Sequence, residues 1–597
     1  MKKAIKILFA FLILSSVASG QIEIRDSELL KVYNSITSER VYLHQNSTLI
    51  FAGERLYFSL YCLNAKTNKL SEFSKVAYVE MLGSDQQVVF KQRVRLNSGL
   101  GHADFFLPTS VASGSYKLVA YTRWMKNAHQ DSFFQSDIFV INPYQTNEKV
   151  LPLPPDPLDS TLLSEPEKKF DISSTDKNSI NEVSKYLNLL NEKRKFKKRE
   201  KTSIILNLAD QASLVGNFSL SVRKVDELQH PSKIKAEDFL RNRNTKKKDP
   251  ASRQNQIFLP ELRGELISGK ITHRTTGEPV EGKKVSLSIP GSDFVYDVAN
   301  SNENGSFFFN LYDGDYGDTG IFQVIDDLEG EYEIAIDEHP SLDYEKLEFS
   351  DFLINKSMKD VILERSVQNQ IENSYAETRR DVVLDGEGLI PFYRNPDEQY
   401  DLDDYTRFNT IEETMVEIID HVWIRKDKDG SSFFQVRPNE GFPESGLRPL
   451  LIVDGVFVEK HEDFMEFNSK RVRRISLSRD KFIMGSYTFQ GLLVINTITA
   501  DYHRTYYKDY LKNVPLFRPQ PRKNYFSQQY PEENKALTDR IPDFRTQLFW
   551  LPNLELNGEE KKLEFYTSDI SGDYEICLEG FSPTGRPISD RAIITID

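Results

Sequence analysis

The sequence is poor in the residues that build covalent or metal-based sites. It has only two cysteines, Cys62 and Cys577, far apart and each within an alternating apolar segment. This excludes a disulfide framework, and we expect two separate buried thiols rather than one long-range bridge. Its nine histidines form no His-x-x-Glu pair and no two lie within five residues of each other. We therefore expect no protein-built zinc site and no other cofactor.

An excess of positive charge is also missing. Lys and Arg total 76 against 90 Asp and Glu, which gives a formal net charge of −14. A nucleic-acid-binding protein normally has the opposite balance, so DNA and RNA are excluded as partners. No stretch after the N-terminus reaches the roughly 18 apolar residues that a membrane span needs. We expect no direct membrane span.

The N-terminus has the three regions of a cleaved secretory signal. Lys2, Lys3 and Lys6 precede an apolar run over residues 7–14, and Ala18-Ser19-Gly20 ends the segment. No cysteine stands at the cleavage point. The sequence therefore predicts a signal peptide over residues 1–20 and an unlipidated periplasmic protein, associated with the outer membrane or exposed on the cell surface.

The dominant periodicity is two, which is typical of strands. Leu56, Phe58, Leu60 and Cys62 alternate with polar or aromatic residues, and similar short segments recur between Gly, Asn and Pro turns. At roughly 100–200 residues per domain, 597 residues predict about four domains. The fold class expected is mainly β, with several sandwiches. Helical patterns cover residues 180–190, 358–371 and 410–419, and breaks fall at residues 150–166, 245–252 and 514–531.

Two segments resemble macroglobulin-type sandwiches. In residues 27–143, Gly53 launches an alternating strand and Ser113-Gly114-Ser115-Tyr116 makes a Gly-x-Tyr corner, in which glycine permits the turn. Residues 535–597 repeat the pattern with Gly572-Asp573-Tyr574. The protease trap of that family needs a thioester cysteine next to Glu and Gln, which neither cysteine offers, so trapping is not expected.

Residues 261–345 resemble the carboxypeptidase regulatory-like sandwich. The resemblance rests on Leu266–Ile271, Thr276-Gly277-Glu278-Pro279-Val280 and Asn302–Phe309. This module is the accessory part of metallopeptidases and implies no catalytic centre.

Residues 346–505 resemble the plug domain of TonB-dependent outer-membrane receptors. The matching segments are Leu451–Val456, Val472–Leu477 and Phe489–Thr497, together with the helix expected at residues 410–420 and the strand at 421–425. Too few residues follow Asp501 to form a barrel of about 22 strands. The resemblance therefore implies the plug fold without a transport role.

Taken together, the chain resembles exported Gram-negative envelope proteins that string such modules together. This family has no known catalytic centre, and its functions centre on outer-membrane machinery. The expected domains are a signal peptide (1–20), an MG2-like sandwich (27–143), a Pro-rich linker and helix (144–200), macroglobulin-like strands and linker (201–260), a regulatory-like sandwich (261–345), a small α+β plug-like domain with preceding helices (346–505), an aromatic and Pro-rich strap (506–534) and a terminal macroglobulin-like sandwich (535–597).

Two acidic clusters are better explained as structure than as sites. Residues 313–318 carry three carboxylates, but the twelfth position of a calcium loop would be Val324 rather than Glu, which favours a turn. Asp401, Asp403 and Asp404 precede a predicted helix, and we expect them to cap or favour its N-terminus. No catalytic residue is assigned.

The candidate partner interface has two parts. Arg471, Arg473 and Arg474 form a basic strip that either meets an acidic partner or lies solvated on an exposed strand. The segment 506–530 interleaves aromatic residues, Arg and Pro, so it must lie along some surface, either of the protein itself or of a partner. Its candidate contact residues are Tyr506, Tyr507, Phe517, Arg518, Tyr525 and Phe526.

The sequence favours a non-enzymatic periplasmic scaffold or accessory subunit that associates with an outer-membrane β-barrel protein or complex, in transport, secretion or barrel assembly. Two alternatives remain open. One is a cell-surface protein that binds glycans or acts as an adhesin, and the other is an envelope hydrolase with an unrecognised acid pair.

Overall fold

The protein forms two compact units, each built from separated stretches of chain. A computed structural model describes residues 38–128, 130–145, 184–189, 193–207, 214–242, 258–291, 294–312, 314, 317–337, 342, 344–345, 347–384, 392–393, 395–530 and 540–597. Unit 1 comprises residues 263–340 and 385–518, and unit 2 comprises residues 22–262, 341–384 and 519–597. The predicted signal peptide and the breaks at 150–166 and 245–252 lie outside the described residues.

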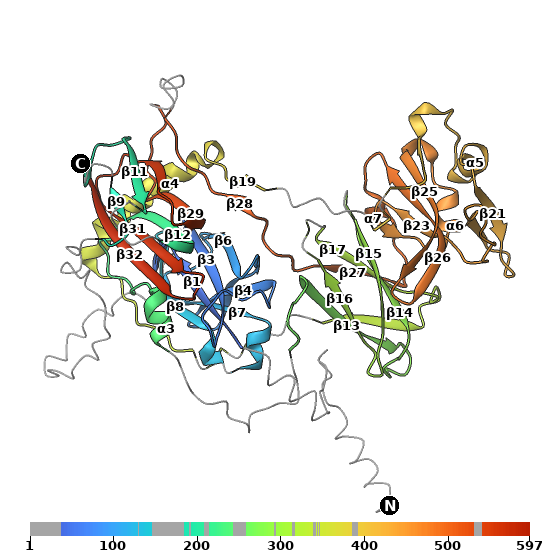
Figure 1. Cartoon of the computed structure of the whole chain (residues 1–597), viewed down its shortest axis with the longest axis horizontal. Helices are drawn as coiled ribbons and strands as arrows, with labels where there is room; N and C mark the ends of the chain where they lie inside the picture. Colours follow the sequence, from blue (N-terminus) through green and yellow to red (C-terminus); the bar gives the residue numbers. More distant parts are fainter. Residues whose placement is uncertain are drawn as a thin grey trace, which may run out of the picture. The chain divides into compact units, whose positions relative to one another are not determined.

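Unit 2 begins with the sandwich predicted for residues 27–143 (Figure 1). The alternation in β3 (Arg55–Asn64) predicts one buried face, but both faces of this strand are buried. Ser59 and Tyr61 are buried as well as Leu60. The second face of this sheet packs on another sandwich. One sheet has the order β1 (Glu39–Gln45), β3 (Arg55–Asn64), β6 (Leu100–Phe106), and the other has the order β2 (Leu49–Phe51), β8 (Phe134–Ile141), β7 (Gly114–Thr122), β4 (Val76–Gly83), β5 (Val88–Arg95).

The second sandwich of unit 2 joins two segments that we expected to form separate modules. Strands from residues 201–224 pair directly with strands from the C-terminal segment, so neither segment has a complete core of its own. One sheet has the order β10 (Lys195–Phe196), β32 (Pro587–Ile596), β31 (Gly572–Phe581), β12 (Val215–Lys224), β29 (Gln547–Asn557), and the other has the order β30 (Lys561–Tyr566), β11 (Lys201–Leu206), β9 (Asn188–Leu189).

The structure corrects two local predictions in this unit. The helix predicted over 180–190 is wrong at Asn188–Leu189, which pair with β11 as a strand. Gly114 does not have positive φ, and a Cβ there would meet Tyr116 only at an ordinary contact distance of 3.7 Å. The corner is instead fixed by the Tyr116 hydroxyl, which donates to the carbonyl of Ala112 at 2.8 Å. Tyr574 repeats this contact with Ile570 at 3.0 Å.

A buried polar layer joins the two sandwiches of unit 2. The Tyr42 hydroxyl donates to the Glu579 carboxylate at 3.1 Å, and the Tyr61 hydroxyl donates to Ser219 Oγ at 3.0 Å. His44 Nδ1 lies 2.6 Å from the same Ser219 oxygen. Helix α3 (Ala236–Arg241) covers one end, where Phe239 packs against Tyr42. Because buried polar groups need partners, these contacts specify how the two sheets meet.

Helix α4 (Lys359–Ser374) was predicted as part of the plug-like domain, but it packs in unit 2. Its buried Arg365 reaches between the sandwiches and contacts Glu54 with Nε at 2.8 Å and Nη2 at 2.9 Å. Nη1 of Arg365 contacts Asp226, and Arg223 contacts Glu54 at 3.2 Å. This four-residue ion cluster anchors the helix to both sandwiches. Periodicity predicts the helix itself, but the ion-pair partners of Arg365 lie far away in sequence, so no local pattern indicates where the helix packs.

Unit 1 contains the sandwich expected at residues 261–345, completed by a strand from the predicted strap. The strap strand β27 (Leu511–Pro515) pairs antiparallel with β17 (Thr319–Val324), with Thr319 opposite Pro515 and Gln323 opposite Leu511. One sheet has the order β16 (Ser306–Leu311), β13 (Glu265–His273), β18 (Tyr332–Ile336), and the other has the order β15 (Val295–Asn300), β14 (Lys284–Ile289), β17 (Thr319–Val324), β27 (Leu511–Pro515).

The remaining part of unit 1 is a small α+β domain. A hairpin joins β23 (Leu450–Val453) to β24 (Val456–Phe457). It turns through Asp454 and Gly455, which both have positive φ, as a tight two-residue hairpin requires. A hairpin of β21 (Val422–Lys426) and β22 (Ser432–Val436) and the helices α5 (Ile411–Glu417), α6 (Glu462–Met465) and α7 (Tyr502–Thr505) accompany a mixed sheet of order β20 (Glu398–Asp401), β25 (Val472–Met484), β26 (Tyr487–Thr497), β23 (Leu450–Val453), β24 (Val456–Phe457). The predicted mainly β class, with sandwiches and a small α+β domain, is confirmed.

Asp401 and Asp403, which we expected to cap the helix at residues 410–419, form ion pairs instead. Helix α5 is capped by Thr410 and Glu413 in a reciprocal capping box. Asp401 instead forms an ion pair with Arg474 in the neighbouring strand, and Asp403 pairs with Arg407. The prediction failed because the Thr-x-x-Glu pattern lies closer to the helix than the acids do. Asp313 and Asp315, the first acids of the other cluster, lie outside the described residues.

Both cysteines are buried and free. Among the described residues, no helix combines the length and apolar character that crossing a membrane would require. That same part of the chain holds no group of three or more His, Cys, Asp or Glu side chains suited to a metal ion.

Replacing Glu54 tests the ion cluster. Glu54→Ala leaves Arg223 and Arg365 buried without their shared carboxylate, so we expect it to lower the free energy of unfolding by about 3–5 kcal/mol. Glu227→Ala removes a carboxylate whose pair with Lys224 is largely solvent-exposed, and should cost about 1 kcal/mol or less. Urea unfolding monitored by circular dichroism measures both. Equal losses would show that the cluster does not hold α4.

His44 should make unit 2 acid-sensitive. Burial, together with the nearby positive charges of Lys233 and Arg591, lowers its pKa from 6.5 to about 3. Below about pH 6.5 the unfolded chain binds a proton at this histidine and the folded chain does not. The free energy of unfolding therefore decreases as the pH is lowered from about 6.5 to about 3. From pH 7 to pH 5 this one group should cost about 2 kcal/mol. Urea titrations at pH 5, 6 and 7 should show a smaller loss for His44→Asn, and an unchanged slope would contradict the assignment.

Candidate functional site

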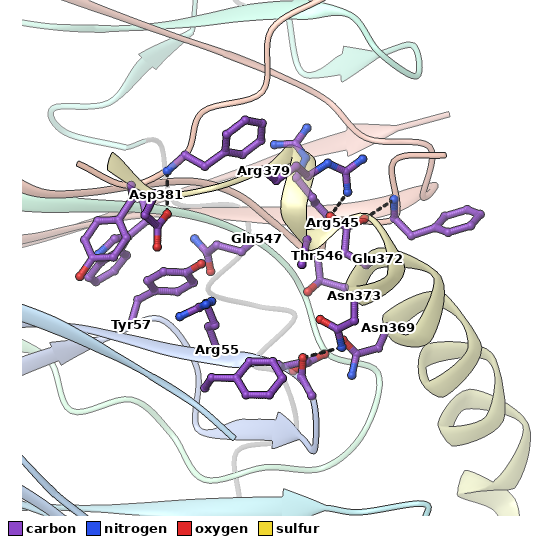
Figure 2. A pocket seen from close by; sticks show the side chains of 18 of the residues that line it. Arg55, Tyr57, Asn369, Glu372, Asn373, Arg379, Asp381, Arg545, Thr546 and Gln547 are labelled. Carbon is purple, nitrogen blue, oxygen red and sulfur yellow. Dashed lines mark hydrogen bonds and ion pairs between the residues drawn. The ribbon is translucent and has the colours of Figure 1, made fainter. Parts of the chain in front are cut away.

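A cavity of about 460 Å³ in unit 2 is the best candidate for a functional site. We call it the α4 pocket. Figure 2 shows Arg55, Tyr57 and Gln547 in its centre, with the side chains of α4 on one side and Asp381 on the other. Its wall comes from the turn between β2 and β3, from α4 and the segment after it, from the end of the strap and from the start of β29. The lining residues used below are Gly53–Arg55, Tyr57, Phe106, Arg223, Arg365, Asn369, Glu372, Asn373, Glu377, Arg379–Asp381, Val383, Lys523, Tyr525, Phe526, Phe544–Gln547, Leu548, Phe549 and Trp550.

The floor of the pocket is the Glu54 ion cluster. Burial alone would raise the pKa of Glu54, but the adjacent guanidinium groups of Arg365 and Arg223 lower it to about 2. A hydrogen bond from the backbone N–H of Phe51 acts in the same direction. Glu54 is therefore ionised at any physiological pH and its oxygens are occupied by arginine donors.

The helix wall grips the turn that carries Glu54. The amides of Asn369 and Asn373 donate to the carbonyls of Ala52 at 2.8 Å and Gly53 at 2.9 Å. Gly53 has φ +91°, and a Cβ there would come within 2.8 Å of the Asn369 amide nitrogen. The glycine is thus required both by the backbone conformation and by the close approach of α4.

Aromatic rings form another wall. Tyr525 stands edge-on to Tyr57 with ring centroids 5.1 Å apart, and Trp550 lies 5.9 Å from Tyr57. Burial raises the pKa of both tyrosines, so their hydroxyl groups stay protonated. The rings give the pocket an apolar surface with fixed geometry.

The mouth of the pocket is basic. Asp104 accepts from both Arg55, at 2.5 Å, and Lys523, at 2.8 Å. Arg379 pairs with Glu372, whose other oxygen accepts from the backbone N–H of Phe544 at 3.0 Å. The mouth is completed by Arg380, which is 73% exposed and pairs with the equally exposed Glu377.

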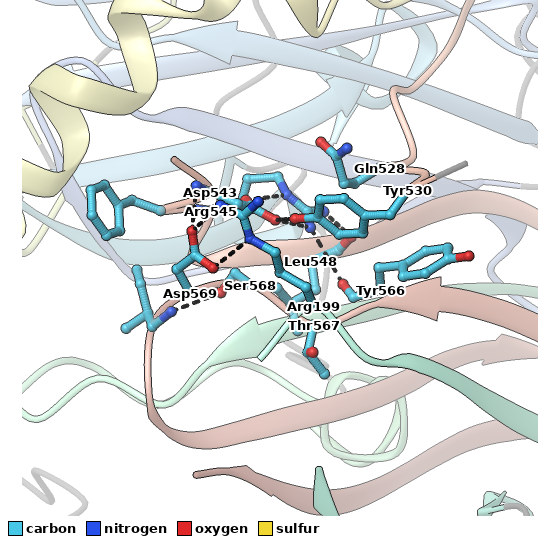
Figure 3. A network of polar contacts seen from close by, with 12 residues as sticks. Arg199, Gln528, Tyr530, Asp543, Arg545, Leu548, Tyr566, Thr567, Ser568 and Asp569 are labelled. Carbon is cyan, nitrogen blue, oxygen red and sulfur yellow. Dashed lines mark hydrogen bonds and ion pairs between the residues drawn. The ribbon is translucent and has the colours of Figure 1, made fainter. Parts of the chain in front are cut away.

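A second polar network fixes the segment that leads into β29 (Figure 3). Arg545 contacts Asp543 with Nε and Nη2, both at 2.7 Å, and the Tyr530 hydroxyl donates to the same carboxylate at 2.5 Å. Arg199 contacts Asp569 at 2.6 Å, and Asp569 accepts from the backbone N–H of Asp543 at 2.9 Å. Burial would raise the pKa of Asp543, but Arg545 holds it below its usual value. These contacts preorganise the β29 side of the pocket.

The structure does not bring the predicted interface residues together. In unit 1, Arg474 is paired with Asp401 and Arg471 with Asp501, while Arg473 is exposed. Tyr506 is buried, stacked 5.2 Å from Tyr502, and donates to Asp463. Arg518 contacts the buried Glu265 at 2.8 Å. Tyr507 is 70% exposed and Phe517 is 37% exposed. Only Tyr525 and Phe526, in unit 2, line the α4 pocket.

Two short parts of the predicted strap form strands. Its first half supplies β27 to unit 1, and its second half supplies β28 (Lys523–Asn524), which pairs with β19 (Val382–Val383) in unit 2. The rings of Tyr506 and Tyr525 contact other rings of the chain itself, which is one of the two alternatives that the sequence left open.

Sequence reasoning missed Glu54, Arg365 and Trp550. One signal was available, since Arg365 interrupts the apolar face of a predicted helix and a charge there implies a buried partner. Trp550 lies in a strand whose alternation explains it without a site. The described lining contains no histidine, cysteine or serine. Its carboxylates accept from arginine or backbone donors.

Comparisons with known proteins give distant matches to solved structures alone. No family model and no curated protein matches the sequence. Escherichia coli alpha-2-macroglobulin activated by porcine elastase aligns with 94% of this chain and 44% of its own, at 10% identity and a TM-score of 0.22. A Salmonella alpha-2-macroglobulin mutant aligns with 94% of this chain and 39% of its own, at 8% identity and a TM-score of 0.23. The sporulation control protein Spo0M from Bacillus subtilis aligns with 18% of this chain and 50% of its own, at 14% identity and a TM-score of 0.13. The chain thus spans less than half of the length of these macroglobulins.

Proposed function

We propose that this protein is a non-enzymatic scaffold of the cell envelope that binds a partner protein at the α4 pocket. The observation that carries the proposal is the state of the charged groups around the pocket. Glu54 accepts from Arg365 and Arg223, and Glu372 accepts from Arg379 and a backbone N–H, so these lining carboxylates are held in fixed positions as recognition elements. Positioned ion pairs of this kind give a binding surface its specificity.

The construction of unit 2 supports the same proposal. Two sandwiches, α4 and the end of the strap contribute to one wall, and buried polar contacts hold these segments together. Binding sites gain precision when they are built on rigid elements whose side chains are fixed by a supporting layer. A hydrolase would need a carboxyl group that can hold a transferable proton, whereas the arginine partners of Glu54 lower the pKa of this buried carboxyl to about 2.

The partner we propose is an outer-membrane β-barrel protein or complex, with the scaffold in the periplasm. Support comes from the sequence, namely the export signal expected at residues 1–20 and the plug-like pattern of residues 450–500. A surface-exposed glycan binder would differ in location, and protease treatment of intact cells separates the two, because a periplasmic protein survives it.

Affinity capture tests the proposed function. The tagged full chain, purified from envelopes in mild detergent, should bring down an outer-membrane β-barrel protein identified by mass spectrometry. Tyr525→Ala removes a ring from the pocket and should reduce the captured amount about tenfold, given the weight of buried tyrosines in interfaces. Tyr507→Ala changes an exposed ring of the same segment in unit 1 and should leave capture unchanged. Recovery of a lone monomer would refute the proposal.

A further inference from the structure

The geometry points to the class of partner segment that fills the α4 pocket: an extended peptide that carries a carboxylate side chain next to an aromatic or aliphatic one, added as a strand beside β19. This inference rests on the proposed function of the pocket as a binding site and specifies its ligand.

The first argument is a pair of hydrogen-bond donors without acceptors. Two of the residues that line the pocket carry buried polar atoms with no partner among the described residues, Nε of Arg223 and Nε1 of Trp550. The side chains are almost fully buried, with exposed fractions of 5% and 6%. Both atoms can only donate. Because an unpaired buried donor costs free energy, a small shift of these side chains that brings their donors to acceptors of an occupant would favour binding.

The second argument is the sign of the charge on the wall. Seven cationic side chains line the pocket, but only four acidic ones do. The acids that balance the others, Asp104, Asp226 and Asp543, stand outside the lining. The wall presented to an occupant is therefore basic, and a carboxylate is the protein group that arginine forks recognise best. The cationic lining residues are Arg55, Arg223, Arg365, Arg379, Arg380, Arg545 and Lys523.

The third argument is the apolar part of the wall. Tyr57, Tyr525 and Trp550 form one continuous group of rings, and Leu548 and Phe549 also line the pocket. A volume of about 460 Å³ lies within the range of roughly 300–1,000 Å³ that ligand sites occupy. A carboxylate alone would leave these rings without contacts, so the occupant also carries an aromatic or aliphatic side chain.

The fourth argument favours a peptide over a small molecule. β19 pairs with β28 along one edge, and no other described strand pairs with it. Val382 and Val383 in this strand and Leu384 after it are consecutive exposed apolar residues, with exposed fractions of 61%, 53% and 38%. Val383 also lines the pocket. An extended peptide that adds to this edge covers the apolar residues and directs alternate side chains towards the pocket.

Fluorescence anisotropy with the full mature chain tests the inference. The probe is a fluorescein-labelled seven-residue peptide in which glutamate alternates with phenylalanine and threonine. We expect saturable binding that weakens at least tenfold when glutamine replaces glutamate. N-methylation of alternate backbone amides should weaken binding by a similar factor, because it blocks strand addition. N-acetyl-phenylalanyl-glutamate should compete only poorly.

Protein variants locate the site. Arg380→Glu reverses an exposed charge at the mouth and should weaken binding at least tenfold. Arg241→Glu, on α3, reverses an arginine of matched exposure, 74% against 73%, and should have no effect. Trp550→Phe keeps the ring surface but removes one unpaired donor, and should weaken binding about tenfold. Circular dichroism melting curves establish that each variant is folded.

Each outcome discriminates. Equal affinity for the glutamate and glutamine peptides, or no effect of Arg380→Glu, would overturn the inference. Full binding of the N-methylated peptide, or strong competition by the dipeptide, would also overturn it and assign the pocket to a small carboxylate ligand. If envelope capture succeeds while no peptide binds, the proposed function stands and this inference fails. If the peptide binds while no β-barrel protein is captured, the inference about the ligand of the pocket stands and the proposed β-barrel partner fails.

Discussion

Glu54 is the residue on which the architecture of unit 2 depends. It lies on the turn between β2 and β3 of the first sandwich, Arg223 comes from β12 of the second, and Arg365 comes from α4. Three segments far apart in sequence thus share one carboxylate. Because separating any of them would leave a buried charge unpaired, the cluster defines a single arrangement of these elements. The α4 pocket lies directly above this cluster and takes its shape from it.

The interleaved chain explains why unit 2 is a platform rather than a string of modules. β12 lies between β29 and β31, so residues from the middle of the chain are sandwiched by residues from its end. The sheet of the first sandwich is buried on both faces, and its outer face carries the polar layer of Tyr42, His44 and Tyr61. Such a layer limits sliding of one sheet over the other because its hydrogen bonds form in only one register. A binding surface that spans several elements needs this rigidity.

Local rules predicted the elements well and their assembly poorly. Period-two alternation located β3, and the apolar face of residues 410–419 located α5, because these signals depend on neighbours in sequence. The pairing of residues 201–224 with the C-terminal strands was not predicted. Apolar and polar residues alternate in each segment by itself, and nothing in either segment indicates which strand pairs with it. The pocket was missed for the same reason. Tyr525 and Phe526 were selected for their composition, but Glu54, Arg365 and Trp550 become a site only when long-range pairing brings them together.

The order of the strands also determines when the second sandwich of unit 2 can be completed during synthesis. β12 and β11 emerge from the ribosome long before β29 to β32, yet their sheets are complete only when those last strands exist. Over that interval the apolar faces of β11 and β12 have no cover from their own sandwich, and contacts of such long sequence separation form slowly. A chain cut short before residue 547 would retain the first sandwich with an uncovered sheet, a form prone to aggregation and proteolysis. Completion of the second sandwich therefore depends on synthesis of the last strands.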